Sequence, residues 1–110
     1  MGDRVSISFR HGKDESVAFF SHWDGRDLVK AAQKYARALK VLADSKGEKG
    51  VIMPLDRMDP GTVMVDFIRV YTKKMKVVDS NYYLGATCND GDNSDNGHWT
   101  IDLETGDTDE

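Results

Sequence analysis

An amphipathic helical repeat in the first half of the chain restricts the folds open to this sequence. Apolar residues recur there at steps of three and four positions, at Leu28, Ala31, Ala32, Tyr35, Leu39 and Leu42. Lysine and arginine residues occupy the opposite face, so one side of the predicted helix must be buried against other elements. Turn-forming residues at 44–47 end the predicted helix.

Two strands are expected before this helix. Val5 to Phe9 alternates apolar and polar residues, which is the pattern of a strand with one buried face. Residues 17–20 form a second extended run, and turn formers at 11–14 separate the two, so the pair predicts a β-hairpin. Asp24 lies between the hairpin and the helix, where we expect its side chain to accept amide hydrogens of the first helical turn.

The second half of the chain predicts another helix and two more strands. Asp59-Pro60 has the form of an N-cap followed by proline at the first helical position, and the predicted helix runs to about Lys74. Residues 47–59 are expected to form a loop, in which 51–53 are apolar enough for a short extended piece. The segments 82–87 and 98–103 are expected to be strands that pair with each other.

This order of elements, ββ-α-α-ββ, predicts an α+β fold. Two helices would pack on one antiparallel sheet of about four strands. Residues 1–104 form a single domain in this interpretation, and residues 105–110 form a frayed acidic tail.

Composition and charge narrow the classes of function. A single cysteine, Cys88, cannot form an internal disulfide and points to a reducing, cytoplasmic compartment. The chain lacks the run of about 20 apolar residues that a membrane-spanning helix needs. All 15 basic residues fall in 1–76, whereas 77–110 holds nine acidic residues and no basic one. Phosphates would repel that acidic end, so nucleic acid is not expected as a partner.

A loop rich in aspartate and asparagine between the last two predicted strands is the most specific functional feature. Residues 92–97 match the D-x-[DNS]-x-[DNS]-G opening of a calcium-binding loop, which supplies oxygen ligands at alternate positions. The sequence therefore predicts a divalent-cation site, with calcium as the expected ion. Its ligands would be Asp90, Asp92, Ser94, Asp95 and Asn96.

Two observations bear on this prediction from opposite directions. An EF-hand is not expected, because the twelfth position of the better register is Leu103 instead of glutamate and the flanks have strand character. Aspartate, asparagine, glycine and serine also favour ordinary turns for backbone reasons alone. Crowding several like charges into one loop has a repulsive cost, however, which a bound cation would relieve. Both interpretations stay open at the level of the sequence.

The three histidines, His11, His22 and His98, would form an acid–base site only if the fold brought two of them together. Their spacing does not determine whether they converge. No nucleophile elbow, zinc-protease motif, P-loop or dinucleotide fingerprint is present, so an enzyme is not expected. The His22-Trp23 pair precedes the first predicted helix, where it would either close the core or contact a ligand.

The chain resembles a loose group of small uncharacterised proteins encoded by phages, prophages and some archaea. The resemblance rests on the alternating first strand, the segment Ser21-His22-Trp23-Asp24-Gly25, and the late strand ending in Ile101-Asp102-Leu103. It covers about half of the chain and transfers no catalytic residue. It implies a strand–strand–helix order and an accessory role in a microbial or viral setting.

Two functions therefore lead on sequence grounds. One is a small domain that binds a divalent cation through residues 90–97. The alternative is a non-enzymatic protein-interaction or accessory domain with no metal site, which contacts a protein partner through the acidic loop or the Trp23 corner.

Overall fold

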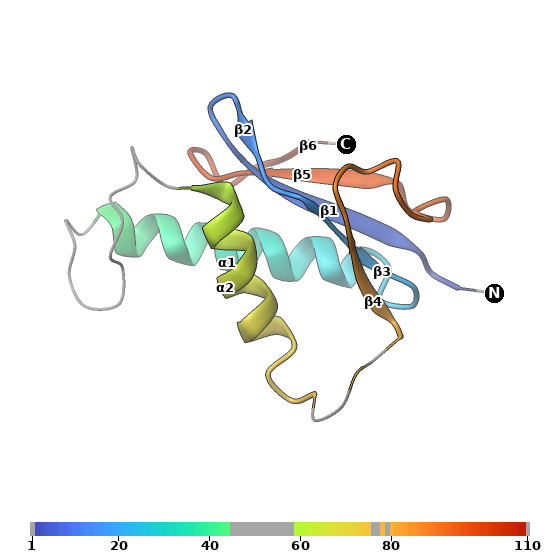
Figure 1. The fold of residues 1–110 in the computed structure, drawn as a ribbon. Coiled ribbons are helices and arrows are strands. Elements are labelled where there is room, and N and C mark those ends of the chain that lie inside the picture. The colour runs from blue at the N-terminus through green and yellow to red at the C-terminus, as the bar shows by residue number, and fades with distance from the viewer. Residues whose placement is uncertain (1, 45–58, 76–77, 79, 110) are drawn as a thin grey trace.

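In the described part of the chain, two helices lie against one face of a mixed six-stranded β-sheet (Figure 1). The computed structural model describes residues 2–44, 59–75, 78 and 80–109. The α+β class expected from the sequence is confirmed. The expected antiparallel sheet of about four strands is wrong in detail, because the described residues form six strands and β1 and β5 pair in parallel.

The predicted hairpin at the start of the chain is confirmed. Strand β1 (Val5–His11) pairs antiparallel with β2 (Asp14–Glu15) and, further along, with β3 (Ala18–Ser21). The register shifts by one residue between the two pairings, and Ser16 lies at the shift. Its hydroxyl accepts a hydrogen bond from the Phe9 amide at 2.9 Å, so the bulge leaves that amide bonded.

The two late strands form as expected but do not pair with each other. Strand β4 (Tyr82–Gly85) pairs antiparallel with β3, whereas β5 (His98–Asp102) pairs parallel with β1. The sheet order is β4-β3-β1-β5-β6, so two strands separate β4 from β5. Both run in the same direction, and parallel strands cannot be joined by a tight turn. Residues 86–97 therefore form a crossing connection instead of a hairpin loop.

Both predicted helices are present. Helix α1 (Arg26–Asp44) buries Leu28, Ala32 and Ala36 against the sheet. Helix α2 (Pro60–Tyr71) begins as predicted, because the Asp59 carboxylate accepts hydrogen bonds from the amide and the hydroxyl of Thr62. The helix ends three residues before the predicted Lys74.

The core lies between the helices and the inner face of the sheet. Phe67 of α2 is at its centre, with ring centroids 5.5 Å from Phe9, 6.3 Å from Phe19 and 5.5 Å from Tyr35. Tilted and edge-on contacts of this kind add to the free energy of apolar burial. The alternating residues Val5, Ile7 and Phe9 supply the sheet side of this core, as their spacing predicts.

The C-terminal residues differ from the expected frayed tail. Thr108–Asp109 forms β6, which pairs antiparallel with β5. The Gly106 amide also bonds the Asp102 carbonyl at 2.8 Å. The predicted loop at 47–59, with its short extended piece at 51–53, lies outside the described residues except for Asp59.

Candidate functional site

The acidic loop lies across the face of the sheet that the helices leave open. The loop packs closely on the sheet at Gly91, where an added Cβ would come within 2.6 Å of the Tyr83 ring and 2.8 Å of the Phe20 ring. Those two rings are stacked with centroids 4.9 Å apart. Asn93 donates to the Ser6 hydroxyl at 2.8 Å, which attaches the loop to β1. Residues 86–97 thus cover part of the sheet instead of projecting from it.

Arg4 sits among the acidic residues of this loop. Its guanidinium lies 3.1 Å from the Asp92 carboxylate and 3.5 Å from that of Asp95. Its backbone amide also donates to Asp95 at 2.9 Å. The repulsion between the loop carboxylates, which favoured a bound metal ion on sequence grounds, is therefore relieved at least in part by the positive charge of Arg4.

The five predicted metal-binding residues are brought into one loop, and most of them also bond within the chain. Asp90 accepts from the Thr87 amide at 2.9 Å, and Asp92 accepts from the Ser94 amide at 3.1 Å. The hydrogen bonds to Asp92 from the backbone and side chain of Ser94 hold its pKa below the usual range. Asn96 donates to Asp3, a carboxylate that sequence reasoning did not include.

The described residues contain no group of three or more histidine, cysteine, aspartate or glutamate side chains arranged to hold a metal ion. A cation in this loop would need its carboxylates to turn away from Arg4 and from the amides they accept. Cys88 is a free, half-buried thiol in the same loop.

The three histidines lie apart in the fold. His98 is opposite Ser6 in the β1–β5 register, whereas His11 is at the far end of β1. His22 follows Ser21, which pairs with Val5, so it lies beyond the other end of β1 and across that strand from His98. Strands two apart are separated by roughly 10 Å. The convergence that an acid–base site requires is not observed among the described residues.

His98 instead belongs to a polar chain on the open face. Ser8 donates to Glu15 at 2.6 Å, so its oxygen must accept from His98 Nε2 at 3.0 Å, because a hydroxyl has one hydrogen. Nδ1 of the neutral ring then accepts from Ser6 at 2.7 Å. Burial lowers the pKa of His98, while the Glu15 carboxylate partly offsets that effect.

This polar chain resembles a catalytic arrangement only in its residue types. Ser6 and Ser8 are 0% and 1% exposed, so no substrate reaches either hydroxyl. The hydroxyls of Ser6 and Ser8 and both ring nitrogens of His98 each have a hydrogen-bond partner. This is expected of a buried polar network with a structural role.

The His22-Trp23 corner is fixed by one carboxamide. Asn81 Oδ1 accepts the amide hydrogens of His22 at 2.9 Å and of Trp23 at 2.8 Å. The Asp3 amide donates to the His22 carbonyl, and the Gly25 amide donates to the Asp3 carbonyl, each at 2.8 Å. The Trp23 side chain is nevertheless 57% exposed, so it does not close the core.

Asp24 adopts a role that the sequence did not predict. Its carboxylate accepts hydrogen bonds from the hydroxyls of Tyr71 at 2.6 Å and Tyr82 at 2.7 Å, and from the Asn81 amide at 3.2 Å. It therefore joins the end of α2 to β4 instead of capping α1. Burial and this carboxylate raise the pKa of Tyr71.

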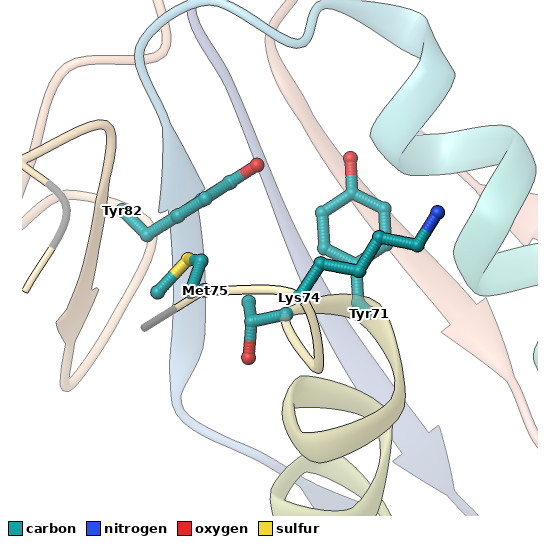
Figure 2. Close-up of a pocket in the computed structure, with 5 residues that line it drawn as sticks. Tyr71, Lys74, Met75 and Tyr82 are labelled. Carbon is teal, nitrogen blue, oxygen red and sulfur yellow. The ribbon is translucent and has the colours of Figure 1, made fainter. Parts of the chain in front are cut away.

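A groove of about 240 Å³ opens beside these tyrosines (Figure 2). It is lined by Tyr71, Thr72, Lys74, Met75 and Tyr82. The aromatic rings come from α2 and β4, and Lys74 and Met75 come from the turn after α2. Sequence reasoning missed the groove because Tyr71 and Tyr82 lie 47 and 58 residues from Asp24, and neither position carries a local motif.

Comparison with models of known families, with curated proteins and with solved structures gave no match to this chain. Within the described parts of the chain, no helix is both long and apolar enough to cross a membrane. Any assignment of function therefore depends on the residues themselves.

Proposed function

We propose that this domain is a non-enzymatic protein-interaction module whose contact surface is centred on Trp23. The observation that carries the proposal is an indole that is 57% exposed although its backbone is held by hydrogen bonds to neighbouring segments. Tryptophan is among the residues that contribute most to binding at protein interfaces. A rigid backbone lowers the entropy lost when such a residue is covered by a partner.

The position of the groove beside Tyr71 and Tyr82 supports a contact surface at the Trp23 corner. Asn81, which bonds the Trp23 amide, directly precedes Tyr82 in the chain. Trp23 and the groove therefore lie at the same end of the molecule. An exposed tryptophan and a depression lined in part by tyrosines at one end of the molecule suit a protein interface, where aromatic residues often dominate binding.

Photo-crosslinking tests this proposal. A crosslinking amino acid at position 23 should give discrete adducts in cells, whereas the same residue at position 41 should not. Val41 is a suitable control because it is 69% exposed and lies on α1, roughly 20 Å along the helix from its start. Equal adducts at both positions would contradict the proposal.

A partner identified in this way should bind the Trp23→Ala variant at least about tenfold more weakly, a loss typical of a central aromatic contact. The thermal unfolding midpoint should change little, because the side chain is exposed. Val41→Ala should bind like the wild type. Unchanged affinity for Trp23→Ala would exclude Trp23 as the contact.

Divalent-cation binding by residues 90–97 is a second proposal. The observation that favours it is Asp3, which the fold adds to the carboxylates of the loop through its contact with Asn96. Oxygen-rich clusters of this kind suit calcium, and the ion would replace the Arg4 guanidinium.

Titration with calcium and, separately, with magnesium tests the second proposal. Amide resonances of residues 90–97 should shift saturably with calcium only. The thermal midpoint should also rise with calcium concentration, as expected for a ligand that binds the folded state. Asp92→Ala should abolish both effects, whereas Asp107→Ala, in the turn before β6, should not. Flat spectra at millimolar calcium would refute this proposal.

A further inference from the structure

One asparagine of the chain, Asn96, is followed by a glycine, and this pair ends the acidic loop. In a flexible chain such a pair is prone to deamidation, because glycine has no side chain that hinders attack by its backbone nitrogen. Gly97 has a φ of +80°, which residues with a side chain rarely adopt. The turn before β5 therefore requires the same glycine that makes Asn96 reactive.

The chemistry of deamidation sets what the fold must allow. The Gly97 backbone nitrogen attacks Cγ of Asn96, and a bond forms between these two atoms. The Cγ–Nδ2 bond breaks, and Nδ2 leaves as ammonia with the proton that Gly97 loses. Water then opens the cyclic imide, and position 96 becomes aspartate or isoaspartate. Both reacting groups must therefore be free to move.

The fold holds both of these groups by hydrogen bonds. The Gly97 amide donates to the Asn93 carbonyl at 2.7 Å. Nδ2 of Asn96 donates to the Asp3 carboxylate at 2.5 Å and to the Arg4 carbonyl at 3.1 Å. Both of these partners are acceptors, so they hold the Nδ2 side of the carboxamide. The attacking nitrogen and the leaving group would each have to give up its partner.

The backbone around the reacting groups is held as well. The Asn96 amide donates to the Arg4 carbonyl at 2.9 Å, and the Ser6 amide donates to the Gly97 carbonyl at 3.1 Å. The Trp99 indole donates to the Asn96 carbonyl at 2.8 Å. Rearrangement of either reacting group therefore requires this turn to open.

Deamidation would reverse the chemistry of the contact with the N-terminal segment. A carboxylate at position 96 has no hydrogen to donate, and it would face the Asp3 carboxylate and the Arg4 carbonyl, which only accept. The two like charges would also repel each other. Asp3 bonds the corner before α1 through the His22 carbonyl and the Gly25 amide. The modification would therefore also act on the corner that carries Trp23.

We infer that Asn96 is a deamidation site which the folded protein protects, and that its modification separates residues 2–4 from the acidic loop. The reaction proceeds only in molecules whose turn has opened locally. Repulsion in the product then opposes closure of the turn. This inference goes beyond the proposed function, and it is tested on the protein alone, so it stands or fails independently of any partner.

Peptide mass spectrometry after incubation at mildly alkaline pH measures the protection. Deamidation at Asn96 should be at least about tenfold slower in buffer than in denaturing urea, because opening the turn breaks several hydrogen bonds. Asp3→Ala removes one acceptor of Nδ2, so it should speed the reaction in buffer by at least about threefold and leave the rate in urea unchanged. Asp14→Ala, at an exposed carboxylate of β2, should match the wild type in both. Equal rates in buffer and urea, or a wild-type rate for Asp3→Ala in buffer, would overturn the inference.

Urea denaturation of a product mimic measures the consequence. Asn96→Asp should unfold at a lower urea concentration than the wild type. Asn89→Asp adds the same charge to an exposed position of the same loop, without a contact to residues 2–4, and should shift the midpoint much less. The double variant Asp3→Asn/Asn96→Asp places a donor opposite the new carboxylate and should recover part of the loss. An unshifted midpoint for Asn96→Asp, or the same shift for Asn89→Asp, would refute the separation of the two segments.

Discussion

At the scale of single residues, a few polar side chains decide how distant parts of this chain meet. Asn81 accepts two amide hydrogens from the corner before α1, and Asp24 accepts two tyrosine hydroxyls from elsewhere in the sequence. Both side chains supply acceptors for donors that the fold turns away from water. A buried donor without an acceptor would cost about 1–3 kcal/mol. Their positions fix the Trp23 corner and one side of the groove.

Gly25 provides a test of how tightly that corner is built. Its φ of +57° lies in the left-handed region, and an added Cβ would collide with the Asp3 carboxylate, which would have to turn away and lose its hydrogen bond from Asn96. Gly25→Ala should therefore lower the free energy of unfolding by more than the roughly 1–2 kcal/mol that the left-handed conformation alone costs a side chain. Urea denaturation measures the loss.

Gly12→Ala is the matched control for this prediction. Gly12 has a similar φ of +62°, but an added Cβ would meet nothing within 4 Å. Its variant should show the conformational cost without the steric one. Equal losses in the two variants would mean that the contact between Gly25 and Asp3 adds nothing to stability.

At the scale of elements, the sequence predicted which segments fold but not how they meet. The helices α1 and α2, the hairpin of β1 with β3, and the existence of β4 and β5 all follow from periodicity and capping residues, which act over a few positions. The strand with which β4 or β5 pairs does not follow from these local patterns. Alternation in 98–103 is equally compatible with pairing to β4 or to β1, because the inner face is the same in both cases.

The same limit applies to the acidic loop. Its carboxylates and amides are visible in the sequence, but the residue that neutralises part of their charge is Arg4, about 90 positions away. The serines of β1 show a related effect. Their alternation predicts one exposed face, yet Ser6 and Ser8 are buried, because residues of the loop, β2 and β5 contact that face. Local patterns cannot reveal a segment that returns to cover a strand.

At the scale of the whole molecule, the protonation of His98 affects the free energy of unfolding, because His98 bonds the buried serines of β1. Burial holds its pKa below the ordinary value near 6.5. The neutral ring accepts a hydrogen bond from Ser6, so a proton on Nδ1 would oppose that donor and disturb the oxygen that Asn93 contacts. The folded protein therefore binds this proton less tightly than the unfolded chain does.

The sign of the resulting pH dependence follows from linkage. Above pH 6.5 the stability contribution of neutral His98 is complete, and it falls as the pH decreases toward the pKa of the folded state. Each unit of pKa depression corresponds to about 1.4 kcal/mol.

Between pH 7.5 and 5, the wild type should therefore lose more free energy of unfolding than a His98→Gln variant, whatever the absolute stability of that variant. His11→Gln, which leaves the polar chain intact, should retain the wild-type slope. Urea titrations at four pH values measure these slopes, and parallel slopes for the wild type and His98→Gln would show that the proton is bound equally in both states.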